Sequence, residues 1–264
     1  MTSPMIRVGI GGWTFEPWRG GAFYPEHWPI KRELEYASRH LTAIEINGTY
    51  YSGFKPATFA TWRDTAPEGF VFTLKASRFC TNRKVLAEAG PSVEKFVRQG
   101  IVELGDKLGP ILWQFMATKK FDADDFAAFL QLLPSSEAGV ELRHAVQVRH
   151  ESFADPVFVA MCRTAGVAIV FADSTEYPAI ADVTGPFVYA RIESAVEEEP
   201  LGYAPDVLDG WAAMAKAWAA GGEPDGLPYV SRDAAAVPRD TFMFFISGAK
   251  VRNPAAAQAL IGRL

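Results

Sequence analysis

The chain has 264 residues, of which 49% are apolar and 22% are charged. These proportions are typical of a globular protein with a sizeable core, and they exclude disordered, collagen-like and coiled-coil chains. The formal net charge of −5 argues against a surface that is broadly basic for nucleic acid.

Short apolar runs recur along the chain and predict buried strands. They are rich in β-branched and aromatic residues and apolar on both faces, as parallel strands covered on both sides are. The expected strands are Ile6–Gly11, Leu41–Ile46, Gly69–Lys75, Pro110–Phe115, Ala145–Arg149, Val167–Ala172, Phe187–Ile192 and Thr241–Ser247.

Amphipathic segments between the runs predict helices. Proline near a helix start, and glycine or proline beyond its end, set the expected limits. The clearest expected helices are Ser92–Leu108, Asp122–Leu133, Asp155–Thr164 and Asp206–Ala220. Strands alternating with helices in this way predict an α/β fold: a (β/α)8 barrel of the TIM type, as a single domain over residues 1–264. An open doubly wound sheet is the alternative, but no G-x-G-x-x-G pattern follows the first strand.

The start of the chain lacks the charged and apolar order of a signal peptide, and no stretch approaches the roughly 20 apolar residues of a membrane span. Cys80 and Cys162 lack the spacing of metal ligands. We therefore expect reduced thiols and a cytoplasmic protein without contact to a membrane.

Polar residues stand at or just after the carboxyl ends of most of the predicted strands. Ile44 and Ile46 are expected to face the helices, which turns Glu45 inward, and the same alternation is applied to the other strands. The expected ring at the carboxyl ends is Asn47, Lys75, Gln114, Arg149, Asp173, Arg191 and Ser247, with Glu45 one layer deeper. Because barrel active sites lie at this end, the pattern predicts a polar pocket. The alternative is that strand ends are polar because loops begin there.

Three cations in this ring favour an anionic ligand, since guanidinium groups bind carboxylates and phosphates through two parallel hydrogen bonds. The residues expected to bind substrate are Trp13, Asn47, Tyr51, Gln114, Arg149, His150 and Arg191. The candidate catalytic residues are Glu45, Lys75 and Asp173, with either carboxylate as the base. A structural ion pair is the alternative role of Lys75. We expect no resident metal, although Glu45 and Asp173 are the two carboxylates that could share one Mg²⁺.

Motifs along the chain resemble those of domain-of-unknown-function family 72, the YecE-like proteins of bacterial type. They are GIGGWTFEPWRGGAFYP, EINGTYYS, FTLKASRFCT, KLGPILWQF and VRHESF. The resemblance extends from about Arg7 to Leu264 and implies a TIM-type barrel, similar in outline to sugar isomerases and apurinic endonucleases, without an established activity. It also implies strand-end roles for Glu45, Asn47, Lys75, Gln114, Arg149, His150 and Asp173.

Three positions depart from the family pattern. Gln147 stands where a glutamate is usual, Glu193 where a histidine is usual, and Phe245–Gly248, which includes Ser247, replaces an aromatic residue and an acidic turn. The departures weaken a metal or acid–base role, and they favour a changed substrate or a loss of catalysis.

Three hypotheses for function follow. The first is a pocket for an anionic small molecule, such as a sugar phosphate or a phosphodiester, with hydrolase- or isomerase-like chemistry. The second is a nucleic-acid-binding module that uses Arg78, Arg83 and Lys84. The third is a non-catalytic scaffold with a vestigial pocket. The substrate, the oligomeric state and whether the protein is an enzyme stay open.

Overall fold

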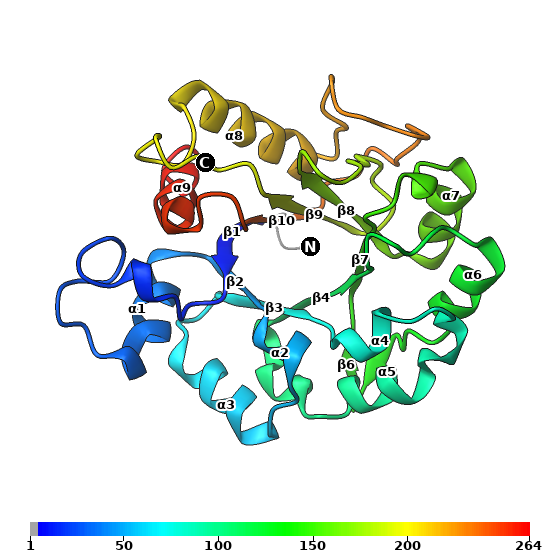
Figure 1. The fold of residues 1–264 in the computed structure, drawn as a ribbon, viewed down its shortest axis with the longest axis horizontal. Coiled ribbons are helices and arrows are strands. Elements are labelled where there is room, and N and C mark those ends of the chain that lie inside the picture. Colours follow the sequence, from blue (N-terminus) through cyan, green and yellow to red (C-terminus); the bar gives the residue numbers. More distant parts are fainter. Residues whose placement is uncertain (1–4) are drawn as a thin grey trace.

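Eight parallel strands close into a barrel in the computed structural model, which describes residues 5–264. The strands are β1 (Ile6–Gly11), β2 (Ala43–Ile46), β3 (Val71–Lys75), β4 (Leu108–Gln114), β7 (His144–Gln147), β8 (Ala168–Asp173), β9 (Phe187–Ile192) and β10 (Asp240–Phe245). Around the barrel they follow the order β1-β10-β9-β8-β7-β4-β3-β2, and Figure 1 shows the helices outside this ring. The predicted TIM-type fold is confirmed; residues 1–4 of the predicted domain lie outside the described part.

The surrounding helices are α1 (Glu33–His40), α2 (Gly48–Tyr51), α3 (Pro56–Thr65), α4 (Arg78–Thr81), α5 (Gly90–Val97), α6 (Ala123–Gln131), α7 (Pro156–Ala165), α8 (Pro205–Ala219) and α9 (Asn253–Ile261). A short hairpin, β5 (Ser136–Glu137) with β6 (Val140–Glu141), lies outside the barrel. Within residues 5–264, none of the helices combines the length and the apolar character needed to cross a membrane.

Side-chain caps explain why two predicted helices begin where expected. Asp122 accepts a hydrogen bond from the Asp125 amide at 3.0 Å, and Asp155 accepts one from the Val157 amide at 2.7 Å. The expected helix Ser92–Leu108 is wrong in its extent. It is divided at Gly100, whose φ of 107° is left-handed, into α5 and a 3₁₀ segment over Ile101–Lys107.

One buried cluster of mostly apolar side chains fills the barrel interior below the polar groups at the carboxyl ends of its strands. Its members are Ala43, Val71, Leu112, Ala145, Ala168, Val170, Phe187, Tyr189, Phe242, Phe244 and Ile246, of which Tyr189 and Ile246 extend to those ends. The strand β1 contributes glycine in place of a side chain, because a Cβ on Gly9 would lie 1.9 Å from the Ala43 carbonyl oxygen. This glycine therefore lets β1 approach β2 closely enough to pair with it.

The alternation assumed for β8 and β10 is wrong. Phe171 points outward, with its ring 5.7 Å from that of Trp218 on α8. Phe245 likewise packs outside the barrel, 5.6 Å from the ring of Tyr203. Residues 168–172 of β8 and 242–245 of β10 are apolar at every position, so alternation gave no guide to the inner face of these strands. As a result, Asp173 and Ser247 share the outward phase and do not point into the barrel.

Replacing Gly9 with alanine tests the close approach of β1 and β2. Gly9→Ala should destabilise the protein by about 3 kcal/mol, the upper end of the usual cost of overpacking. The matched control is Gly210→Ala on α8, where a Cβ meets nothing within 4 Å. That change should stabilise the helix by about 0.5–1 kcal/mol. Urea unfolding measures both, and equal effects of the two changes would contradict this packing.

Candidate functional site

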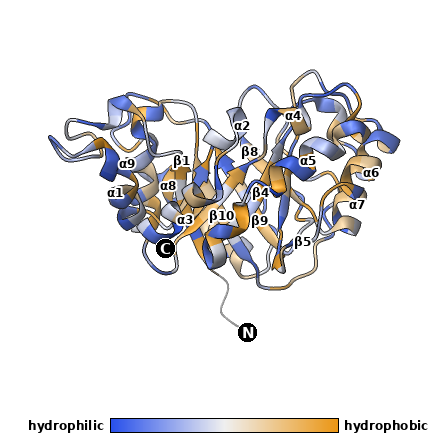
Figure 2. Ribbon diagram, turned by 90° about the horizontal axis from the view of Figure 1, so that it is seen from below, coloured by the Kyte–Doolittle hydropathy of each residue, from blue (hydrophilic) through white to orange (hydrophobic). Residues whose placement is uncertain are grey.

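The polar groups of the barrel gather at the carboxyl ends of its strands. In Figure 2 the helices α2 and α4, which follow the carboxyl ends of β2 and β3, lie along the upper edge. Side chains from β2, β3, β4, β7 and β9 meet at this end, above the apolar interior. We call this region the mouth of the barrel. Its polar residues are Glu45, Lys75, Gln114, Gln147, Arg149 and Arg191.

Glu45 is fully buried at the mouth and is surrounded by donors. The Tyr189 hydroxyl donates to Glu45 Oε2 at 2.7 Å, and the Asn47 amide donates to Oε1 at 3.0 Å. The Thr73 hydroxyl lies 2.9 Å from the Tyr189 oxygen, where it can donate in turn. A buried carboxylate is stable only with such partners, so these residues fix Glu45 in place.

Arg191 joins Glu45 across the barrel. Its Nε and Nη2 donate to the two oxygens of Glu45, each at 3.2 Å, while Nη1 donates to Glu193 at 2.6 Å. The same Nη1 reaches Gln147 Oε1 at 2.8 Å, and that oxygen also accepts from Gln114 at 2.7 Å. The charge of Arg191 is therefore met by carboxylates of the protein itself.

These contacts decide the protonation of Glu45. Burial alone would raise its pKa, but Arg191, the hydrogen bond from Tyr189 and the charge of Lys75 outweigh burial and hold the pKa of Glu45 below its usual range. Glu45 therefore stays ionised at neutral pH and serves as a counter-ion. A role as a general base, which the sequence suggested, is not what this environment favours.

Lys75 and Arg149 have no such partners. Among residues 5–264 the side chain of neither makes an ion pair or a hydrogen bond to a carboxylate. The ammonium group of Lys75 lies 4.3 Å from the centre of the Tyr50 ring, and the guanidinium of Arg149 lies 4.4 Å from that of Tyr177. Both cations rest against aromatic faces, which attract positive charge but leave its hydrogen-bonding capacity unused.

Burial lowers the pKa of Lys75 to about 8, with a further contribution from Arg191. The pKa of Arg149 is also lowered, first by burial and then by Arg191. Two donors at the mouth are buried without any partner among the described residues, namely Arg149 Nε and Gln147 Nε2. An unmet buried donor is costly, so the arrangement favours an acceptor from outside the protein.

Arg149 also lines an open cleft of about 390 Å³ beside the mouth. Its other walls are His150, Glu151, Thr175, Glu176, Tyr177 and Pro178. His150 contributes structurally, since its Nδ1 accepts from the Ser152 amide at 3.1 Å and begins the turn that follows β7.

Three predicted residues lie away from the mouth, and a fourth, Tyr51, lies at its edge with its ring 5.0 Å from that of Tyr50. Asp173 accepts a hydrogen bond from the Ser194 hydroxyl on the helix-facing side of β8. Trp13 packs on Trp62 of α3 with ring centres 5.3 Å apart. Tyr51 is 65% exposed, and its neighbour Tyr50 faces Lys75 instead. Ser247 is exposed in a turn with a left-handed φ of 65°.

Asp173 bonds to Ser194, whereas Glu45 is bound by Arg191, Tyr189 and Asn47, so the two carboxylates share no partner among the described residues. In residues 5–264 no group of three or more His, Cys, Asp or Glu side chains is arranged to hold a metal ion.

Three tyrosines of the mouth were not among the predicted site residues. Alternation placed Tyr189 on the inward face with Arg191, but it did not indicate that the Tyr189 hydroxyl donates to Glu45. Tyr50 and Tyr177 lie outside strands, where alternation gives no signal. They are found only because the loops bring them over Lys75 and Arg149.

Comparison with known proteins identifies the family. The profile described as "Protein of unknown function DUF72" matches residues 7–264. The chain belongs to the DUF72 family. A search of curated proteins gives no match.

Solved structures of two relatives of this DUF72 protein share its fold. The one from Thermotoga maritima is 23% identical, with a TM-score of 0.73 and 97% of each chain covered. The one from Enterococcus faecalis is 17% identical, with a TM-score of 0.67, and the match covers 99% of this chain and 98% of that one. A structure named SacUVDE is 10% identical, with a TM-score of 0.57 over 98% of this chain and 100% of its own. At these identities the likeness shows the fold alone.

Two departures from the family pattern meet at one atom of this DUF72 protein. Gln147 and Glu193 both accept a hydrogen bond from Arg191 Nη1. Glu45 and Glu193 are therefore the two carboxylates that bind Arg191.

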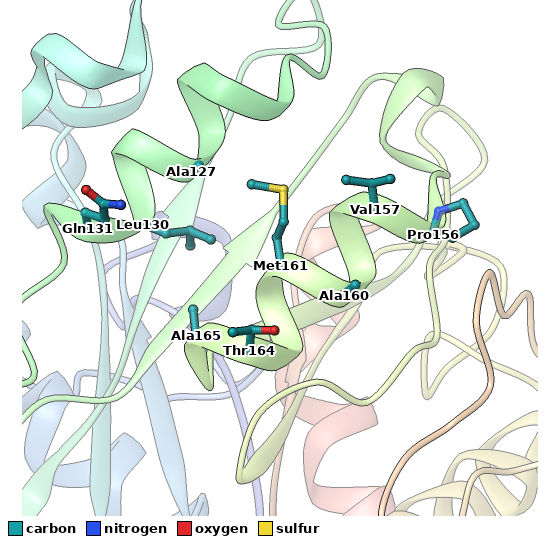
Figure 3. Close-up of a pocket in the computed structure, with 9 residues that line it drawn as sticks. All are labelled: Ala127, Leu130, Gln131, Pro156, Val157, Ala160, Met161, Thr164 and Ala165. Carbon is teal, nitrogen blue, oxygen red and sulfur yellow. The ribbon is translucent and has the colours of Figure 1, made fainter.

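A second groove lies on the outer wall, between α6 and α7 (Figure 3). It has a volume of about 580 Å³ and a mostly apolar lining that includes Leu130, Val157 and Met161. No charged side chain lines this groove, in contrast to the mouth, so it is not the candidate site.

Removing the Glu45 carboxylate tests the link across the barrel. Glu45→Ala should destabilise the protein by about 3–5 kcal/mol, because a buried arginine loses its principal partner. Glu45→Gln keeps the shape and should lose less. Because the pKa of Glu45 is lowered on folding, the stability it gives is present above its unfolded pKa of about 4.3 and is lost as the pH falls through the lower folded value.

Urea unfolding at pH 7 and pH 3 measures these effects. The control is Glu35→Gln, which removes surface ion pairs with Arg32 at 2.7 Å and with Arg39 at 2.9 Å and should change stability far less, because exposed ion pairs contribute little. A loss at Glu45 no larger than the loss at Glu35 would contradict the structural role of the pair.

Proposed function

We propose that the mouth of the barrel binds an anionic small molecule, such as a sugar phosphate or a phosphodiester, between Lys75 and Arg149. The observation that carries the proposal is a pair of half-buried cations without carboxylate partners in residues 5–264. The unpartnered donors Arg149 Nε and Gln147 Nε2 support it, because both require an acceptor.

The charges at the mouth agree with this proposal. Arg191 is bound to two carboxylates, Glu45 and Glu193, so together with Lys75 and Arg149 these five groups carry a net charge of +1. Positive charge that is partly removed from water and lacks a counter-ion is unfavourable, and an anionic ligand relieves that cost. A planar guanidinium suits the two oxygens of a phosphate or carboxylate.

Lys75 is the group best suited to exchange a proton in this site. Its pKa of about 8 lies close to neutral pH, whereas Glu45 remains ionised. Catalysis of a hydrolase- or isomerase-like type would then use Lys75 as acid or base, with Gln114 and Asn47 holding the network in place.

The free thiols of Cys80 and Cys162 suit the reducing cytoplasm that we expect for the protein.

Binding of nucleic acid is the second candidate. Arg78 and Lys84 are exposed beside Phe79, which is 60% exposed, and Tyr51 is exposed nearby. Arg83 is less available, because it donates to the Phe79 carbonyl and to the Ser92 hydroxyl. This alternative requires oligonucleotide affinity that falls steeply with salt, and the net charge of −5 disfavours it.

The third hypothesis is a scaffold with a vestigial pocket. Such a pocket would bind no anion, and the protein would tolerate Lys75→Ala.

Removing the Arg149 guanidinium should abolish anion binding without unfolding the protein. Arg149→Ala should weaken the affinity for inorganic sulfate and for sugar phosphates by at least about tenfold, which corresponds to about 1.4 kcal/mol. The matched control is Arg143→Ala, which removes an equal charge just before β7, at the other end of the barrel. Calorimetric titration compares the two variants, and unchanged affinity in Arg149→Ala would refute the proposal.

Sulfate affinity should also depend on the protonation of Lys75. Since the pKa of Lys75 is lowered to about 8, its positive charge is present below that pH and is lost above it. Affinity should therefore be nearly constant below about pH 7, begin to decline towards pH 8 and fall by up to about tenfold per pH unit above it. In Lys75→Arg the decline should disappear, because arginine stays charged. An identical decline in that variant would show that another group is responsible.

A further inference from the structure

Lys75 has an environment that differs from that of an ordinary surface lysine. It ends β3 at the mouth of the barrel, it is half-buried, and its amine lies over the Tyr50 ring at 4.3 Å. Glu45, whose charge acts on Lys75, already accepts hydrogen bonds from Arg191, Tyr189 and Asn47. Among the described residues no donor makes a hydrogen bond to the Lys75 amine, so its lone pair is free once the proton is lost.

The loss of that proton occurs close to neutral pH. Burial and the positive charge of Arg191 lower the pKa of Lys75 to about 8. At pH 7.5 roughly a quarter of the molecules then carry the free amine, against roughly one in a thousand for a lysine with its ordinary pKa of about 10.4. A free amine that is partly shielded from water is the form of lysine that attacks carbonyl carbon.

We propose that Lys75 is a nucleophile that forms an imine with an aldehyde or ketone whose anionic group is held by Arg149. This inference rests on the proposed function, since Arg149 supplies the anion site, and it narrows the ligand to anionic carbonyl compounds. Arg191 is already bound to Glu45 and Glu193. It therefore leaves Arg149 as the guanidinium at the mouth that is free to bind the ligand's anionic group.

The step balances without a further reagent. The lone pair of Nζ forms a bond to the carbonyl carbon, and the carbonyl π electrons move to the oxygen. The oxygen takes both protons of the amine in turn and leaves as water, which gives the C=N double bond. When the imine takes a proton from solvent it is a cation at the former position of the ammonium group, where the Tyr50 ring and Glu45 stabilise it.

Pyridoxal 5′-phosphate is a suitable probe, because it carries an aldehyde and a phosphate on one small ring. The whole protein is incubated with it at pH 7.5, the imine is reduced with borohydride, and the labelled lysines are identified by peptide mass mapping. We expect Lys75 to be labelled at least ten times faster than any other lysine. Glyoxylate, a smaller aldehyde with a carboxylate, is a second probe for which the size of the mouth matters less.

Two lysine variants test the assignment. Lys75→Arg keeps the charge and should remove the fast labelling. Lys250 is the matched control, because burial also lowers its pKa and its amine also lies over an aromatic ring, that of Phe15, at 4.4 Å. Lys250→Arg should leave the fast labelling unchanged. If neither probe labels Lys75 faster than Lys250, the inference is overturned.

The probe also separates this inference from the proposed function. Arg149→Gln should slow labelling of Lys75 by pyridoxal 5′-phosphate at least tenfold, but it should not slow labelling by pyridoxal, which has no phosphate. If both aldehydes label Lys75 equally fast in the unmodified protein, the nucleophile stands and the anion site at Arg149 falls. If sulfate binds but neither probe labels Lys75, the anion site stands and the nucleophile falls.

Discussion

The ion pair between Arg191 and Glu45 is the interaction on which the upper half of the barrel depends. It joins β9 to β2 across the interior, and both side chains are almost completely shielded from solvent. Such a pair is tolerated only when the remaining hydrogen-bonding groups are satisfied. Tyr189, Asn47 and Gln147 satisfy them, so the pair determines the position of the neighbouring polar side chains.

This pair also decides which charges remain for a ligand. Because Arg191 has two carboxylates of its own, it does not compete for an external anion, and Lys75 and Arg149 do. The positive charge of Arg191 also disfavours the protonated form of Lys75 and thereby contributes to its lowered pKa. Burial and this arginine together therefore account for the lowered pKa on which the proposed reactivity of Lys75 depends.

The fold could be predicted from the sequence because strand positions and the alternation with helices are encoded in local patterns. The inner face of β2 was also predictable, since Glu45 is its one charged residue between apolar neighbours. In β8 and β10 adjacent positions are almost all apolar, so the alternation could not be assigned and Asp173 was placed on the wrong side. The partners of the inward residues depend on distances across the barrel, which no local pattern contains. Arg191 was therefore expected to hold the ligand, whereas in the structure Arg191 is already bound by Glu45 and Glu193.

The central claim is that the mouth binds anions through charges that the protein does not neutralise. The most direct measurement is a thermal-shift comparison of phosphorylated sugars with the matching neutral sugars, with and without Mg²⁺. A ligand at one hundred times its Kd adds about 2.7 kcal/mol of stability, which raises Tm by roughly 5–11 °C for a protein of this size. The account predicts such a shift for phosphorylated compounds alone. No shift with any of them, or equal shifts with neutral sugars, would contradict it.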